Sequence, residues 1–198
     1  MFFKTAASVF LLSLVPLLQS CATVLVAGAA TGAVVATDRR TVGSMADDEA
    51  VEIKASAGIS ADNQLKGQVH INVTSMNGIV LLSGEAVSAE ARDRMLSQVR
   101  TIPSIRRIHN EVRIAPLRSF GERASDSWYT TKVKSRLLFT RDLDSNLIKV
   151  VTENTTVYLL GLVTHREGDI AANSAAQVGG IGGVVKLFEF TDNPKHQE

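Results

Sequence analysis

The chain has 198 residues, of which 45% are hydrophobic and 21% charged, and its net charge at pH 7 is +1. This balance argues against a nucleic-acid partner, because neutralising a phosphate backbone needs a strongly basic surface. The chain holds one cysteine, which excludes a disulfide framework.

Residues 1–20 are predicted to be a lipoprotein signal peptide. Lys4 gives a short positive head, and residues 6–18 form an apolar stretch that is long enough for a signal-peptide core but too short to span a bilayer. Residues 18–21, LQSC, resemble the bacterial lipobox, with Leu three positions before the cysteine and a small Ser directly before it.

Lipidation at Cys21 explains why an exported chain carries one unpaired cysteine. The alternative, an ordinary secreted protein with a free thiol, would leave a reactive group in an oxidising compartment. Acyl chains such as palmitate on the sulfur and the new amino terminus would anchor the chain stably, since more than one chain is present. Ala22, rather than Asp, favours the outer membrane over retention in the inner membrane.

Residues 21–45 are expected to be a lipidated tether rich in Ala and Gly. The apolar stretch 24–36 within it is too short to cross a membrane. A flexible tether near the lipid surface is the simpler interpretation, and packing of its Ala/Gly face is the alternative.

The remainder of the chain repeats itself. Residues 70–87 and 147–164 each contain an alternating apolar run, a turn and a second run, which predicts a β-hairpin. Aligned with offset 77, the two segments pair Ile71 with Ile148, Val73 with Val150, Val80 with Val157, Leu82 with Leu159 and Gly84 with Gly161.

Each hairpin is followed by a helix and a last strand. The helices are expected at 88–100 and 165–178, and the strands at 102–112 and 181–190. The two strands are aligned with offset 79, which pairs Ile108 with Leu187.

Another helix precedes each hairpin, at 46–59 and at 125–139, where Ser125 or Asp126 is the expected N-cap. Each unit therefore reads helix–strand–strand–helix–strand. The predicted organisation is a first domain at 46–115, a linker at 116–122, a second domain at 123–191 and a polar tail at 192–198.

Both units resemble the BON domain family in their V-x-V strands and in the stretches GIVLLSG and TVYLLG. Together with the lipobox, the segments 37–43, 125–138 and 150–164 resemble the dual-BON outer-membrane lipoproteins of the DolP type. The resemblance covers residues 46–191. It implies an α+β fold of two tandem domains, each with two helices packed on a three-stranded mixed sheet. The chain departs from the family at GGIGG, residues 179–183, and at Thr155, where a turn glycine is common.

No catalytic or metal-binding pattern is present in the sequence. The histidines, His70, His109, His165 and His196, lack zinc-ligand spacing, and no phosphate loop or nucleophile elbow occurs. The carboxylates Asp47, Asp48 and Glu49 are interpreted as the solvated start of a helix. We therefore expect neither an enzyme nor a cofactor.

The first helices of the two units differ in chemistry. Aligned with offset 80, Ile53 meets Val133 and Ala57 meets Leu137 as apolar positions. The same alignment replaces Asp48 by Trp128, Glu49 by Tyr129, Glu52 by Lys132 and Ser56 by Arg136. The second helix is therefore aromatic and basic where the first is acidic.

A helical wheel at about 100° per residue places Trp128 nearly opposite the sheet-facing group. That group contains Tyr129, Thr130, Val133 and Leu137. Ser135 lies within about 20° of Trp128, Lys132 and Phe139 within about 40°, and Arg136 at about 80°. Aromatic and basic side chains on one face are typical of an interfacial membrane helix. Two alternatives remain: Trp128 packs on the other domain or the linker, or this face binds a protein.

The family resemblance favours the membrane. It implies that the second BON domain binds anionic phospholipids such as phosphatidylglycerol and cardiolipin, that the protein supports outer-membrane integrity, and that it contacts the outer-membrane protein assembly machinery. Carried over by position, the lipid-facing candidates are Trp128, Tyr129, Lys132, Val133, Arg136 and Leu137, and the wheel adds Ser135 and Phe139. Val133 and Leu137 rank lower because the wheel turns them inward.

Overall fold

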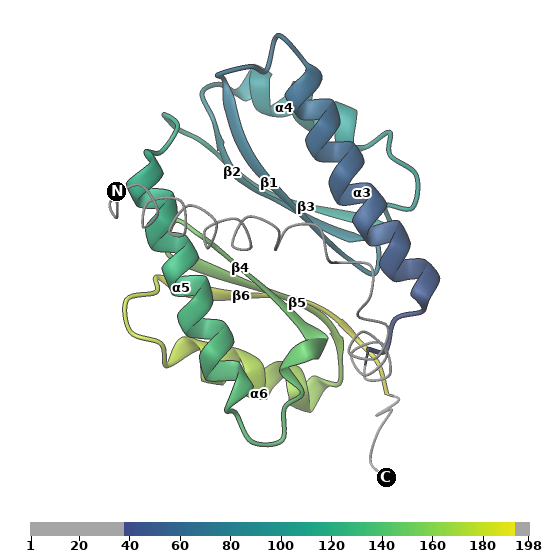
Figure 1. The fold of residues 1–198 in the computed structure, drawn as a ribbon, viewed down its shortest axis with the longest axis vertical. Coiled ribbons are helices and arrows are strands. Elements are labelled where there is room, and N and C mark those ends of the chain that lie inside the picture. The colour runs from purple at the N-terminus through teal and green to yellow at the C-terminus, as the bar shows by residue number, and fades with distance from the viewer. Residues whose placement is uncertain (1–37, 193–198) are drawn as a thin grey trace, which may run out of the picture. The chain divides into compact units, whose positions relative to one another are not determined.

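The structure is a computed structural model, and it describes residues 38–192 (Figure 1). Cys21, the signal peptide, most of the tether and the tail from residue 193 lie outside the described residues. The described residues belong to one compact unit that holds both repeats.

The first domain is a three-stranded sheet with two helices (Figure 1). Its strands lie in the order β1-β2-β3, with β1 antiparallel to β2 and β2 parallel to β3. Its elements are α3 (Val42–Ala61), β1 (Val69–Met76), β2 (Ile79–Ala86), α4 (Ala89–Val99) and β3 (Arg107–Ile114).

The second domain repeats this order and topology. Its sheet has the order β4-β5-β6, again with one antiparallel and one parallel pair. Its elements are α5 (Phe120–Leu138), the short 3-10 helix η2 (Ser145–Leu147), β4 (Ile148–Glu153), β5 (Thr156–Val163), α6 (His165–Ala176) and β6 (Gly183–Phe190). The expected α+β class with two helix–strand–strand–helix–strand units is confirmed.

Both long helices begin earlier than the sequence suggested. α3 begins at Val42 rather than at residue 46, because the Thr41 hydroxyl caps it by accepting from Ser44 N. α5 begins at Phe120, inside the expected linker 116–122, because Ser119 and Glu122 form a capping box. The expected N-caps of the second helix, Ser125 and Asp126, therefore lie within it.

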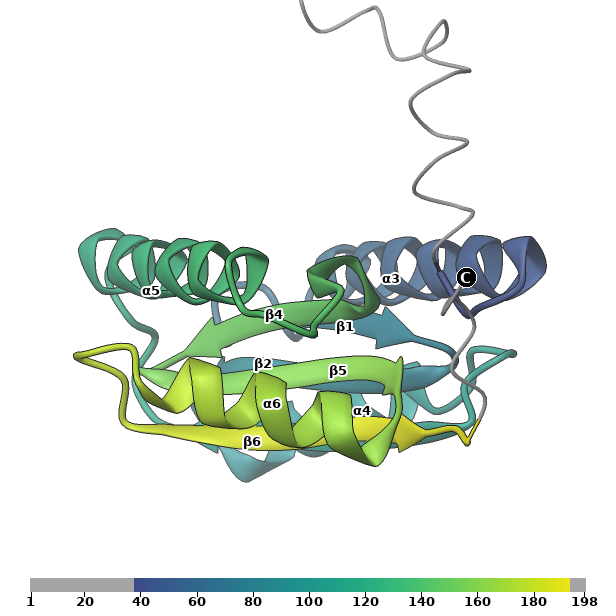
Figure 2. The ribbon, with the colours of Figure 1, turned by 90° about the horizontal axis from the view of Figure 1, so that it is seen from below.

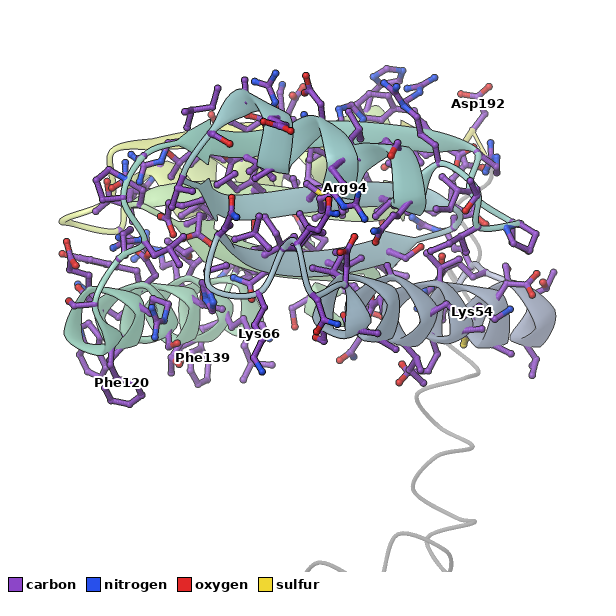
Figure 3. The ribbon with its side chains drawn as sticks, turned by 90° about the horizontal axis from the view of Figure 1, so that it is seen from above. Lys54, Lys66, Arg94, Phe120, Phe139 and Asp192 are labelled. Atoms are coloured by element: carbon purple, nitrogen blue, oxygen red, sulfur yellow. The ribbon has the colours of Figure 1, made fainter. Side chains whose placement is uncertain are left out.

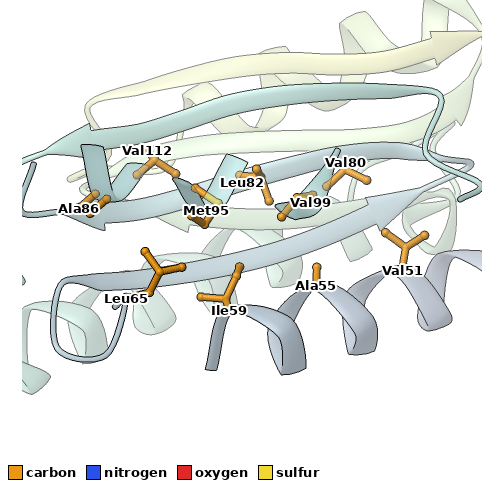
Figure 4. Packing of buried hydrophobic residues seen from close by; sticks show 11 residues of the cluster. Val51, Ala55, Ile59, Leu65, Val80, Leu82, Ala86, Met95, Val99 and Val112 are labelled. Carbon is orange, nitrogen blue, oxygen red and sulfur yellow. The ribbon is translucent and has the colours of Figure 1, made fainter. Parts of the chain in front are cut away.

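Each domain has its own apolar core between its helices and its sheet. In the first domain Val51, Ala55 and Ile59, spaced by four along α3, face β2 and α4 (Figure 4). This i, i+4 spacing lines one side of a helix, so burial of that side holds α3 on the sheet. In the second domain Val133 and Leu137 of α5 occupy the corresponding core.

A third buried cluster joins the two sheets. Met76 and Leu81 of the first sheet pack with Tyr158, Leu160 and Leu187 of the second. Ion pairs lie outside this cluster: Arg106 to Glu189 at 2.7 Å and Lys149 to Glu52 at 2.9 Å. The faces of the sheets that the helices leave free are thus used to join the two domains.

The hairpin alignment with offset 77 holds in three dimensions. Ile71 lies opposite Gly84 in the first sheet, and Ile148 lies opposite Gly161 in the second. A Cβ atom at either glycine would collide with a backbone carbonyl oxygen of the neighbouring strand or the turn before it. Both domains therefore need glycine at the same point of the same strand.

The strand alignment with offset 79 is wrong. Val80 lies opposite Ile108, and its equivalent Val157 lies opposite Val184, which gives an offset of 76. The error of three positions is odd, so it exchanges the two faces of the strand. Ile108 accordingly packs on the helical core, whereas Leu187 belongs to the cluster between the sheets.

Candidate membrane-binding surface

One side of α5 belongs to the core of the second domain and the other is open to solvent. Asp126, Val133 and Leu137 are buried on the inner side. On the outer side Trp128 is 62% exposed and Leu138 is 63% exposed. Figure 2 shows α5 next to β4, with its outer side turned away from both sheets.

Two of the predicted lipid-facing residues are core residues. Val133 is fully buried and Leu137 is 1% exposed, and both pack with the strands of the second sheet. They cannot reach a bilayer while α5 stays on its sheet. Including them as binding residues was therefore wrong, as the helical wheel indicated.

The expected exposure of Trp128 is confirmed, and Phe139, the C-cap residue of α5, is 86% exposed. Ser135 is exposed between them. Since Trp128 keeps most of its surface in solvent, packing against the first domain or the linker does not account for it.

Tyr129 and Lys132 lean toward the loop between α6 and β6. The Tyr129 ring lies over Gly180, whose φ of +95° and missing Cβ leave room for it. Lys132 Nζ donates to the Gly179 carbonyl at 3.0 Å and lies 5.6 Å from the centroid of the Tyr129 ring. The Lys132 ammonium group is thus held beside the Tyr129 ring and the loop that follows α6.

Two exposed apolar residues were missed in the sequence. Phe120 is the first residue of α5 and 81% exposed, and Leu138 is its last. Phe120 and Phe139 both point away from the sheets (Figure 3). The wheel places Leu138 about 80° from Trp128, on the side opposite Arg136; Phe120 was hidden because the helix was started too late. We call Phe120, Trp128, Leu138 and Phe139 the α5 stripe.

The charge around the stripe is positive. Residues 127–141 contain no Asp or Glu but four cations: Lys132, Lys134, Arg136 and Arg141. Within residues 38–192 none of the four forms an ion pair, and the Arg136 guanidinium donates to the neutral Gln177 side chain. These charges are therefore left to act on solvent and on any surface that α5 meets.

Asp48 and Asp126 are both buried. The expectation that Asp48 is part of a solvated helix start was therefore wrong, and the equivalent burial shows that Asp48 corresponds to Asp126 rather than to Trp128. The Asp48 carboxylate accepts from Ser75 Oγ at 2.6 Å and from the backbone N–H groups of Asn77 and Gly78 at 2.7 and 2.8 Å. Burial raises its pKa, but these hydrogen bonds and Arg40 outweigh it and hold the pKa below its usual value.

In the second domain the Asp126 carboxylate makes the equivalent hydrogen bonds, because it accepts from the backbone N–H groups of Asn154 and Thr155 and pairs with Arg118. Both aspartates thus hold the turn of their hairpin. The helices therefore align with offset 78 rather than 80. Ile53, taken as a core position in the earlier alignment, is 59% exposed.

The corrected alignment keeps the contrast between the two helices and makes it more specific. Trp128 now replaces Ala50, Leu138 replaces Ser60 and Phe139 replaces Ala61, whereas Lys132 replaces another lysine, Lys54. The charge also differs, because Glu49, Glu52, Ser56 and Gly58 align with Ser127, Thr130, Lys134 and Arg136. The second helix therefore differs from the first both in large exposed apolar side chains and in charge.

Within residues 38–192 there is no cluster of three His, Asp, Glu or Cys side chains that could hold a metal ion. No helix in this part of the chain is long and apolar enough to cross a bilayer.

Comparison with known proteins identifies the repeat. The family model of the BON domain matches residues 47–116 and 125–192. The chain belongs to the BON domain family. The outer membrane lipoprotein DolP of Haemophilus influenzae is 35% identical to it over 175 residues, which cover 88% of this chain and 91% of that protein. This chain is therefore a dual-BON protein of the DolP type.

A second relative of this BON protein is the 21 kDa hemolysin of Actinobacillus pleuropneumoniae. It is 35% identical over 153 residues, covering 77% of this chain and 79% of the hemolysin. Among solved structures, CdsD, a structural protein of the type III secretion system of Chlamydia trachomatis, is 19% identical. The match covers 73% of this chain and 63% of that one, and its TM-score of 0.29 is too low to support any argument.

Proposed function

We propose that this BON protein is an outer-membrane lipoprotein facing the periplasm, and that its second domain binds anionic phospholipids through the α5 stripe. In this role it supports the integrity of the outer membrane. The observation that carries the proposal is the pairing, on α5 and the three residues that follow it, of four exposed large apolar side chains with four cations that lack carboxylate partners within residues 38–192.

The energies of such a surface suit reversible membrane contact. Each Lys or Arg near an anionic membrane contributes about 1 kcal/mol. Burying one large apolar side chain contributes roughly 1.5–3 kcal/mol when burial is complete, and less when the side chain only reaches the headgroups. Trp128 is well suited to the headgroup level because its ring is amphipathic. Together these terms amount to several kcal/mol, which is enough for binding and small enough for release.

Because a lipid anchor would already hold the protein at the membrane, even a weak affinity of the α5 stripe for lipid would be sufficient for contact. The lipobox ending at Cys21 and the 35% identity to an outer membrane lipoprotein both support acylation at that cysteine. Residues 22–37 span at most about 55 Å when extended, so acylation at Cys21 would keep the two domains close to the membrane. The tether therefore allows α5 to reach the membrane that holds the anchor, at a high effective concentration.

Co-sedimentation with vesicles tests the proposal. The chain from residue 22 onward would be mixed with phosphatidylglycerol, cardiolipin or neutral phosphatidylcholine vesicles. We expect binding to the anionic vesicles only, weakened by salt, by Trp128→Ala and by Lys132→Glu.

A protein partner on the same face is the competing function, and the outer-membrane protein assembly machinery is the partner that the family resemblance implies. Failure to bind any vesicle would reject the lipid proposal. Retained partner capture that is lost in Trp128→Ala would then assign the stripe to a protein.

A further inference from the structure

A groove of about 550 Å³ opens between the end of α5 and α6. The α5 end contributes two arginines and an exposed aromatic ring, and α6 contributes amides and a hydroxyl. Its lining is Arg136, Phe139, Thr140, Arg141, Ile170, Asn173, Ser174 and Gln177.

The groove is positively charged. No carboxylate lines it, and two guanidinium groups do. The nearest carboxylates along the chain are engaged elsewhere: Asp142 pairs with Arg166 at 3.1 Å, and Asp169 pairs with Lys186 at 3.1 Å. An anion entering the groove would therefore meet two full positive charges and no nearby uncompensated negative one.

Its polar groups are available for a ligand. Arg136 donates only to the neutral Gln177 side chain, which a phosphate oxygen can replace. In the part of the chain that the structure describes, the side chains of Arg141 and Asn173 have no hydrogen-bond or ion-pair partner. The Thr140 and Ser174 hydroxyls satisfy each other at 2.7 Å. Two free donors and one exchangeable donor thus face the same space.

The position of the groove connects it to the α5 stripe. Phe139 belongs to both, so a lipid whose acyl chains contact Phe139 would bring its headgroup to the arginines. The C-terminal end of α5 opposes an anion there with roughly half a charge. Two guanidinium groups outweigh it, and their planar donors suit phosphate oxygens.

We propose that this groove binds the phosphate group of one anionic phospholipid headgroup, with Arg136 and Arg141 as its donors and Asn173 as a side-chain amide donor. The proposal rests on the membrane function of α5 for the source of the ligand. It adds a discrete headgroup site, built partly from α6, to a helix surface that would otherwise attract anionic lipids only by its overall charge.

Charge-matched variants separate a site from overall charge. Arg136→Gln and Arg141→Gln would be compared with Arg100→Gln, which removes the same charge from an exposed arginine of the first domain that has no ion pair within residues 38–192. For each groove variant we expect about fivefold weaker binding to phosphatidylglycerol vesicles, from the loss of one close charge. For Arg100→Gln we expect less than a twofold change. An equal loss in all three variants would overturn the proposal.

A second measurement does not depend on vesicles. The side-chain amide resonances of Asn173 and Gln177 would be followed by NMR during titration with water-soluble dihexanoyl phosphatidylglycerol and, separately, inorganic phosphate. Shifts with the short-chain lipid that are lost in Arg141→Gln support the site, even if vesicle binding and hence the function of α5 fail. Shifts of equal size with inorganic phosphate would reject the lipid as the source. No shift with either ligand would reject the groove, even if vesicles bind.

Discussion

Leu137 and Leu138 are adjacent in the chain and lie about 100° apart around α5, so that one faces the core and the other faces solvent. Leu137 is 1% exposed and packs in the core of the second domain, whereas Leu138 is 63% exposed at the end of the α5 stripe. Leu137 therefore stabilises the fold, whereas Leu138 is available to contact a membrane or a partner.

The same substitution should therefore have different effects at the two positions: a loss of stability at Leu137 and a loss of vesicle binding at Leu138. Leu137→Ala should lower the free energy of unfolding by about 3 kcal/mol, because it removes a buried side chain and leaves a cavity. Leu138→Ala should change it by less than about 0.5 kcal/mol, as is usual for an exposed position, yet weaken binding to phosphatidylglycerol vesicles. Urea denaturation and co-sedimentation measure the two quantities. Equal stability losses would contradict the assignment of the two faces.

Asp48 and Asp126 should be among the most sensitive positions in the chain. Asp48→Ala leaves two backbone N–H groups of the hairpin turn and the Nη1 group of Arg40 without their acceptor. Losses of this kind cost about 3–5 kcal/mol in total. Asp47→Ala is the matched control, because its side chain is exposed and should matter little. Equal effects in thermal unfolding would show that Asp48 is solvated after all.

Thr155 should be a site of strain. It occupies the position of Gly78 in the second hairpin turn and has a φ of +62°, which is unfavourable for a β-branched residue. Thr155→Gly should raise the free energy of unfolding by about 1 kcal/mol, since the left-handed conformation costs roughly 1–2 kcal/mol. Calorimetry should show a Tm rise of about 2–4 °C. The reverse change, Gly78→Thr, should destabilise strongly, because its Cβ would lie 2.8 Å from the Ser104 carbonyl oxygen. A lower Tm for Thr155→Gly would show that the turn is unstrained.

The Arg39–Glu167 pair should make stability depend on pH. Arg39 donates two hydrogen bonds to Glu167, at 2.7 and 2.9 Å, which lower the pKa of that carboxyl to about 2 despite its partial burial. Because the folded-state pKa lies below the unfolded value near 4.5, this contribution is present above about pH 4.5 and is lost as the pH falls toward 2. Glu167→Gln should therefore be less stable than the natural chain at pH 7. The difference should shrink between about pH 4.5 and 2.5 in urea denaturation. A difference that stays constant over this range would rule out the pair as its source.

The hairpins could be predicted from the sequence, but the facing of the helices could not. Alternating apolar residues and the pair Gly84 and Gly161 define the strands, because only glycine fits where a neighbouring carbonyl approaches. On α3 the apolar pattern is misleading, since Asp48 is buried while Ile53 is exposed. The buried carboxylate is stabilised by N–H groups of the turn between β1 and β2, which is distant along the chain, and no local pattern on the helix reports them.

The candidate site, too, could be predicted from the sequence only in part. Trp128 could be placed on the outer face because helical geometry alone decides its direction. The directions of Lys132 and Arg136 depend on Gly179 and Gln177, which come from the other helix and its following loop. These acceptors come close to α5 only in the folded chain, so the directions of the long basic side chains could not be predicted from the sequence.

The fluorescence of Trp128 tests the central claim most directly, because it is the only tryptophan in the chain. Phosphatidylglycerol vesicles would be added to the chain from residue 22 onward, with and without bromine-labelled acyl chains. The account predicts a blue shift with the anionic vesicles, quenching by the brominated lipid, and neither effect with phosphatidylcholine. A protein that co-sediments with phosphatidylglycerol vesicles while its Trp128 emission stays unchanged would show that the membrane is bound by another surface.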